Sequence, residues 1–144
     1  MIVVLDANVV VSAYLSHGGP PAEVMRRWNR RAYEVVTSPS ILAEYDRVLR
    51  YPHLRPVHGL NDAAIEAVVK RFRRSATLIE PTQRLAVVQD ESDNRFLECA
   101  IEGGADLIVS GDRHLLGVGQ YQGIRIVTPA AFVAYLDSPD TDAV

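Results

Sequence analysis

Short apolar segments alternate with helix-like segments along this chain, and that alternation most constrains its fold. The first segment, Ile2–Leu5, carries no polar residue and is mostly β-branched or aliphatic, as in a strand buried on both faces of a sheet. Further short strands are expected at residues 33–36, 76–79, 106–109 and 124–127. Short buried strands separated by helices predict parallel βαβ units with right-handed crossovers. We therefore expect an α/β fold with a central parallel sheet of four to five strands.

The segments between these strands carry helix start and stop signals. Ser38-Pro39 and Thr128-Pro129 each place a capping side chain before a proline at the first helical position. Gly103-Gly104 suits a helix end. Helices are expected at residues 7–15, 20–32, 39–49, 62–74, 95–102, 113–116 and 130–136, with a loop over 51–59 and a turn followed by extended chain over 80–88.

The chain has 144 residues, the size of one domain with a substantial core. We expect a single domain over residues 1–137 and a polar tail over 138–144. No apolar run reaches the roughly 18 residues that a membrane-spanning helix needs. Met1 leads directly into the first strand without a basic segment or cleavage site, which argues against a secretory signal. The single cysteine, Cys99, lies in an apolar helical stretch, which favours a buried thiol in a cytoplasmic protein.

Acidic residues follow two of the expected strands. Asp6 ends the run Ile2–Leu5, and Asp112 follows Leu107–Val109 after two intervening residues. The carboxyl ends of parallel strands meet at one edge of the sheet, where open α/β proteins form their sites, so these carboxylates should lie close together. The simpler alternative is that each one caps the helix that follows it.

Two further acids are expected near that edge from helices. Glu44 lies two turns into the third expected helix, and Asp93 lies at the start of a later helix beside Asp90 and Glu91. Solvent exposure would account for Glu44 alone, and favourable acid placement at a helix N-terminus would account for Asp93 alone. Three acids within four residues exceed what capping requires, so Asp90 is a candidate for an additional ligand.

Converging carboxylates repel one another unless a proton or a cation joins them, so a divalent-metal site is the first hypothesis. Mg²⁺ and Mn²⁺ prefer oxygen ligands, and Mg²⁺ retains waters that can become nucleophiles. Asn8 and Ser110 are candidate supporting residues, because an amide or a hydroxyl beside such a site can orient a carboxylate. The sequence has no Cys/His cluster for zinc, no glycine-rich phosphate loop with a lysine, and no serine nucleophile elbow.

The net charge of −3 does not by itself favour a nucleic-acid partner, but its distribution matters more than the sum. Without the four candidate site acids the net charge would be +1. Basic residues gather at positions 26–31 and 70–74. Arginine suits phosphate because its planar fork bonds bidentately, although a solvated helix face is the simpler explanation of either cluster.

Four segments of the chain resemble the motifs of PIN domains, in the same order. Residues 1–8 (MIVVLDAN) resemble the opening of that family, where an aspartate ends the first strand and a polar residue follows two positions later. SPSILAE over residues 38–44, DESDNRFLECA over 90–100 and LIVSGD over 107–112 resemble its other three acidic segments. The resemblance covers essentially the whole chain. Within the family it is similar to prokaryotic single-domain members, toxins of VapBC-type toxin–antitoxin pairs.

This resemblance implies a three-layer α/β/α sandwich and an endoribonuclease that uses one or two Mg²⁺ or Mn²⁺ ions. It assigns the metal-binding and catalytic acids to Asp6, Glu44, Asp93 and Asp112. It also implies RNA as substrate, a cognate antitoxin protein and a homodimer. Single-stranded RNA is favoured over duplex, because a cleft of acids needs an exposed, bendable backbone. Some relatives carry a further acid two residues after the fourth, where this chain has His114, a residue type more often found in surface or packing roles.

Three other classes of protein place acids in similar positions. A phosphoryl-accepting receiver domain needs a lysine at the end of its last strand, and Lys70 is the only lysine in the chain. A haloacid-dehalogenase-type phosphatase would have a second acid where Asn8 stands. The more serious alternative is a non-catalytic module that uses the same fold to bind RNA or a protein. The presence of all four acids argues against simple loss of activity.

Overall fold

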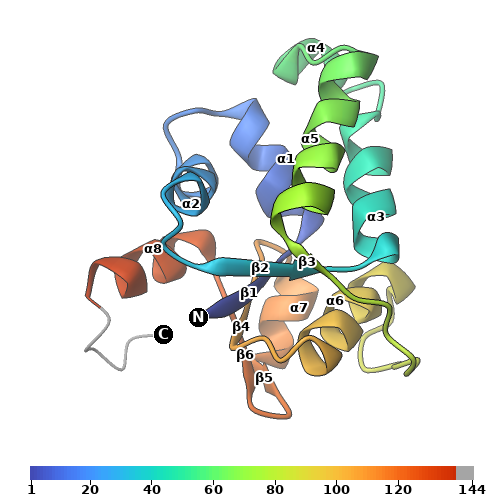
Figure 1. Ribbon diagram of the computed structural model, residues 1–144, viewed down its shortest axis with the longest axis vertical. Coiled ribbons are helices and arrows are strands. Elements are labelled where there is room, and N and C mark those ends of the chain that lie inside the picture. The colour runs from blue at the N-terminus through green and yellow to red at the C-terminus, as the bar shows by residue number, and fades with distance from the viewer. Residues whose placement is uncertain (139–144) are drawn as a thin grey trace.

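The computed structural model describes residues 1–138 and consists of a six-stranded sheet with helices on both faces (Figure 1). In chain order the elements are β1 (Ile2–Leu5), α1 (Ala7–Leu15), α2 (Pro20–Asn29), β2 (Glu34–Thr37), α3 (Pro39–Leu49), α4 (Arg55–His58), α5 (Asp62–Ser75), β3 (Thr77–Leu78), α6 (Glu91–Glu102), β4 (Leu107–Val109), α7 (Arg113–Val118), β5 (Gln120–Tyr121), β6 (Ile124–Val127) and α8 (Pro129–Asp137). Apart from Ser138, the polar tail expected over 138–144 lies outside the described residues.

The strand order is β3-β2-β1-β4-β6-β5. The first five strands of this order pair in parallel, and β5 pairs antiparallel with β6. The expected parallel sheet is therefore confirmed at five strands. The sixth strand, β5, was not predicted, because a two-residue segment carries too little pattern to be recognised before its partner is known.

Helices α1, α3 and α5 lie above the sheet in Figure 1, and α6 and α7 lie below it, which confirms the three-layer α/β/α sandwich. The central strands β1 and β4 supply the middle of the core: Val3, Val4, Leu5, Ile108 and Val109 are almost completely inaccessible to water. Among residues 1–138, no helix combines the length and the apolar character that a membrane crossing requires.

Several helix predictions were wrong in detail. Helix α2 ends at Asn29 rather than at residue 32, and α7 extends to Val118 rather than to residue 116. Within the expected loop 51–59, residues Arg55–His58 form the short helix α4, which ends at Gly59 in a left-handed conformation (φ 68°). Helix α6 begins at Glu91 rather than at Arg95, because the side chain of Asp90 accepts a hydrogen bond from the N–H of Ser92 at 2.9 Å and caps the helix.

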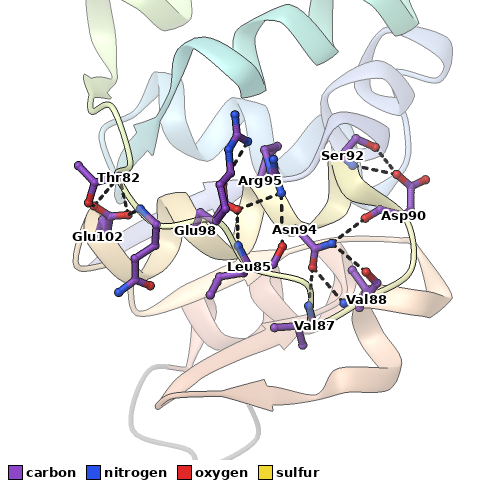
Figure 2. A network of polar contacts seen from close by, with 12 residues as sticks. Thr82, Leu85, Val87, Val88, Asp90, Ser92, Asn94, Arg95, Glu98 and Glu102 are labelled. Carbon is purple, nitrogen blue, oxygen red and sulfur yellow. Dashed lines mark hydrogen bonds and ion pairs between the residues drawn. The ribbon is translucent and has the colours of Figure 1, made fainter.

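The segment between β3 and α6 belongs to no helix or strand, and the polar face of α6 holds it in place (Figure 2). Three side chains spaced four residues apart on α6 accept hydrogen bonds from its backbone N–H groups: Glu102 from Thr82 and Gln83, Glu98 from Leu85, and Asn94 from Val87 and Val88. These contacts satisfy backbone groups that would otherwise need a neighbouring strand. They also fix the chain that delivers Asp90 and Asp93 to the sheet edge.

Candidate active site

The candidate acids gather where the order of the strands reverses. Strand β1 pairs with β2 on one side and with β4 on the other, and the register places Leu5 opposite Val109. Asp6 follows immediately, and its backbone N–H donates to the carbonyl of Val109 at 3.0 Å. Asp112 lies three residues beyond the end of β4. The crevice outside the carboxyl ends of such strands is where open α/β sheets bind ligands.

Asp6 is buried, with 4% of its surface exposed. It occupies the N-cap position of α1, yet its side chain makes no capping hydrogen bond, so capping does not explain the carboxylate. The hydroxyl of Ser110 donates to its Oδ2 atom at 2.5 Å. Burial raises the pKa of Asp6 from 3.8 to about 6, the bond from Ser110 opposes that rise, and the charges of Asp112 and Glu44 add to it.

Asp93, in the first turn of α6, is 6% exposed, and its Oδ2 atom is buried without a hydrogen-bond partner. Burial raises its pKa from 3.8 to about 7, and repulsion from Asp112, Asp6, Asp90 and Glu44 contributes further. An unsatisfied carboxylate oxygen among other carboxylates is costly, and a proton or a cation relieves the cost.

Glu44 lies on α3, and 15% of its side chain is exposed. Its charge raises the pKa of both Asp6 and Asp93, so α3 brings it to the same site as expected. Its carboxylate forms an ion pair with the guanidinium of Arg47, one turn along the helix. Arg47 was not recognised as part of the site from the sequence. The spacing of three residues between opposite charges on a helix was the available signal.

Asp112 and Asp90 both serve as helix caps. Oδ1 of Asp112 accepts a hydrogen bond from the N–H of His114 at 2.6 Å. Asp90 accepts from the N–H and the hydroxyl of Ser92, and these two bonds lower its pKa. Helix capping, the simpler explanation, therefore accounts for the positions of both carboxylates. Their charges nevertheless contribute to the raised pKa of Asp93.

His114 is exposed and lies beside Asp90 rather than in the protein interior. With Val88, Gln89 and Asp90 it lines a cavity of about 330 Å³ at the rim of the site. Asn8 lies in the first turn of α1, and its Oδ1 accepts a hydrogen bond from the N–H of Gly111 at 3.1 Å. Asn8 thus ties α1 to the loop after β4, and in this structure it supports the backbone rather than a carboxylate.

Within residues 1–138, no three Asp, Glu, His or Cys side chains lie close enough together to hold a metal ion as they stand. The donor set nevertheless suits a hard divalent cation. All four candidate ligands are carboxylates, Asp93 presents a buried oxygen without a partner, and burial together with mutual repulsion raises the pKa of Asp6 and Asp93. Binding would draw the Glu44 carboxylate away from its ion pair with Arg47.

The two basic clusters lie away from these acids. Helices α2 and α5 lead into the starts of β2 and β3, so their basic last turns lie at the opposite edge of the sheet. Arg26 and Arg27 pair with Glu23, and the guanidinium of Arg71 lies 4.4 Å from the ring centroid of Trp28. These local contacts support the simpler explanation, in which the clusters are solvated helix faces.

Comparison with known proteins places the chain in a family. A family model described as PIN domain matches residues 2–114, so the protein belongs to the PIN-domain family. It is 33% identical over 139 residues to the uncharacterized protein MJ1680 of Methanocaldococcus jannaschii, an alignment that covers 91% of this chain and 88% of that protein.

Two solved structures share the fold. VapBC2 from Rickettsia felis, bound to a DNA fragment from their promoter, matches with a TM-score of 0.58 and 13% identity over 89% of this chain and 98% of that one. VapC20 of Mycobacterium tuberculosis, a Sarcin-Ricin loop cleaving toxin, matches with a TM-score of 0.54 and 16% identity over 85% of this chain and 98% of that one. At such identities the likeness concerns the fold.

Proposed function

We propose that this protein is a divalent-metal-dependent endoribonuclease that cleaves single-stranded RNA. The observation that carries the proposal is the buried Oδ2 atom of Asp93, which has no hydrogen-bond partner and lies within reach of the charges of Asp6, Glu44 and Asp112. Burying an unpaired carboxylate oxygen lowers the stability of the fold. Proteins keep such groups mainly at functional sites, and here a bound cation would pair with the oxygen. Membership of the PIN-domain family supports the same conclusion.

In this proposal Asp6, Glu44, Asp93 and Asp112 hold one or two Mg²⁺ or Mn²⁺ ions. A bound ion of this kind lowers the pKa of a coordinated water and offsets the charge that develops on the phosphoryl oxygens. The protein's own part is to keep the ligands charged and oriented. Ser110 favours the ionised form of Asp6, and Asn8 fixes the loop that carries Asp112. Hydrolysis of the bond to the 3′ oxygen would leave 5′-phosphate and 3′-hydroxyl ends.

We also propose that the protein is the toxin of a toxin–antitoxin pair, cytoplasmic and homodimeric, with an antitoxin protein that covers the acidic site. The support is the shared fold with VapBC2 and VapC20. Helices α2 and α8, which contact each other and are joined by an ion pair between Arg27 and Asp137 at 2.8 Å, are the candidate dimer surface.

The direct test is cleavage of defined single-stranded RNAs by the purified protein with Mg²⁺, with Mn²⁺ and with EDTA. Asp6→Asn should abolish cleavage and keep the circular dichroism spectrum of the wild type. Glu66→Gln, which removes an exposed acid on α5, is the matched control and should cleave normally. Cleavage that survives in EDTA, or in a folded Asp6→Asn variant, would overturn the mechanism.

The second candidate function is a binding module without nuclease activity. Two observations favour it: the Glu44 carboxylate is paired with Arg47, and no three candidate ligands within the described residues converge as they stand. The two functions differ in their response to metal. A nuclease should gain thermal stability from millimolar Mg²⁺ or Mn²⁺ and lose that gain in Asp6→Asn, whereas the binding module should show no shift.

A further inference from the structure

A cation and two aromatic rings lie side by side next to the acidic site, on α3 and the chain that follows it. Besides its ion pair with Glu44, Arg47 donates a hydrogen bond to the hydroxyl of Tyr51. Its guanidinium carbon lies 5.4 Å from the centroid of the Tyr51 ring. The Tyr51 ring in turn stacks on the imidazole of His53, with centroids 5.7 Å apart and an interplanar angle of 25°. We call Arg47, Tyr51 and His53 the aromatic platform.

The aromatic platform lies next to the acids, on the side away from the sheet. Helix α3 starts after β2, at the carboxyl edge of the sheet, and runs away from the sheet (Figure 1). Arg47 follows Glu44 by three residues on α3, a spacing that places side chains above one another on a helix surface, and Tyr51 lies two residues beyond the end of the helix. Arg47 therefore lies between the acids and the two rings.

Core packing does not account for the platform. The side chain of Arg47 is 57% exposed, His53 is exposed, and Tyr51 is half-buried. None of the three belongs to the hydrophobic core or to the apolar side chains that pack against it. A basic residue near the end of α3 suits the helix dipole, which explains the charge of Arg47 but not the stack of two rings beside it.

We propose that the aromatic platform binds the single-stranded RNA that leads to the acids, with bases stacked on Tyr51 and His53 and a backbone phosphate bound by Arg47. This inference rests on the proposed function. Every base has a flat face, so exposed rings beside a cation bind single strands with little regard to sequence. The guanidinium fork suits a phosphate oxygen pair. An acidic segment of a partner protein is the alternative occupant.

The test is equilibrium binding of a fluorescently labelled 12-nucleotide RNA, measured by anisotropy in Mg²⁺ on the uncleaving Asp6→Asn background. Tyr51→Ala and His53→Ala should each raise the Kd by about 5-fold to 100-fold, the range of a lost base–aromatic stack. Tyr51→Trp should bind as the parent does, because it keeps a flat ring. Arg47→Ala should weaken binding and reduce the slope of log Kd against log salt by about 1.

His17→Ala and Arg74→Ala are the matched controls, because both residues are exposed and lie outside the platform. They should leave the Kd unchanged, and thermal midpoints should show that every variant is folded. Unchanged RNA affinity in Tyr51→Ala and His53→Ala would overturn the platform, as would an equal loss in Tyr51→Trp. Variants that bind RNA normally but lose a cognate antitoxin would reassign the surface to a protein partner. Wild-type cleavage of the same RNA tests the proposed function separately.

Discussion

The hydroxyl of Ser110 donates a hydrogen bond to Oδ2 of Asp6 at 2.5 Å and accepts one from the N–H of Asp112 at 2.9 Å. Ser110 is fully buried, so a single hydroxyl couples the acid after β1 to the loop after β4. The bond to Asp6 favours the ionised carboxylate and lowers its pKa against the effect of burial. Ser110 therefore favours the charged form of Asp6, which the proposed metal site requires.

Replacing Ser110 by alanine should weaken the binding of Mn²⁺ or Mg²⁺ by about tenfold or more, because hydrogen bonds to charged groups contribute about 1.5–3 kcal/mol. The variant would leave the buried Asp6 carboxylate harder to ionise. Calorimetric titration with Mn²⁺ measures the affinity. Ser40→Ala, in the exposed first turn of α3, is the control, and equal Mn²⁺ affinities in all three proteins would contradict the role of Ser110.

The buried acids should make the metal-free protein less stable as the pH rises. Burial raises the pKa of Asp6 to about 6 and that of Asp93 to about 7, from an ordinary value of 3.8. Each group holds its proton more tightly in the folded than in the unfolded chain, so its contribution to the free energy of unfolding falls between about pH 4 and pH 7. The unfolding free energy of Asp93→Asn, relative to wild type, should therefore increase over that range and level off above it.

Urea denaturation in EDTA between pH 4.5 and pH 8 measures this difference. Glu102→Gln is the control, and its stability relative to wild type should change little between about pH 5 and pH 8. The N–H groups of Thr82 and Gln83 bond the Glu102 carboxylate and lower its pKa from 4.5, so it stabilises the fold above that pH and less at lower pH. If the stability of Asp93→Asn relative to wild type does not change with pH, then folding does not raise the pKa of Asp93, and the prediction is wrong.

Local pattern was enough to locate the five parallel strands and therefore Asp6, whose position depends only on where a buried strand ends. It was also enough to bring Glu44 to the site, because α3 has a clear start signal and a regular period. The ion pair between Glu44 and Arg47 was missed, since helical spacing alone does not say which charged neighbours meet.

A turn followed by extended chain was expected over residues 80–88, and no helix or strand forms there, but periodicity could not predict what holds this segment in place. It is held by side-chain bonds from α6 across six to twenty residues of chain, such as those of Asn94 to Val87 and of Glu102 to Thr82. Periodic patterns report which face of an element is buried, not which side chain will satisfy a distant backbone group. The capping role of Asp90, which starts α6 four residues earlier than expected, is also a contact between a side chain and a backbone N–H, but it joins residues only two positions apart.

Asn94 should be the most sensitive residue of that arrangement. Its Oδ1 accepts from the N–H groups of Val87 and Val88 at 2.9 and 3.0 Å, and its Nδ2 donates to the carbonyl of Val88 at 2.8 Å (Figure 2). Asn94→Ala leaves these groups partly buried and unpaired, which should lower the free energy of unfolding by about 2–4 kcal/mol. Urea denaturation measures the loss.

The same variant should expose the segment to protease. Trypsin cleavage after Arg84 is expected to be faster in Asn94→Ala than in wild type, because the chain beside α6 loses its anchor. Asn29→Ala, at the exposed end of α2, should change neither stability nor the cleavage rate. Normal resistance at Arg84 in Asn94→Ala would show that Glu98 and Glu102 hold the segment without it.

Gly103 should be intolerant of a side chain for a steric reason. Its backbone is ordinary (φ −87°), but an added Cβ would lie 2.6 Å from Cγ2 of Val36 and 2.7 Å from the carbonyl oxygen of Cys99. Gly103→Ala should therefore force α6 away from β2 and lower the free energy of unfolding by about 1–3 kcal/mol. Gly117 in α7 has open space around its Cβ position, so Gly117→Ala should be neutral or slightly stabilising. Thermal and urea denaturation compare the stabilities of the two variants. Equal stabilities would mean that α6 and β2 do not pack as closely as these distances require.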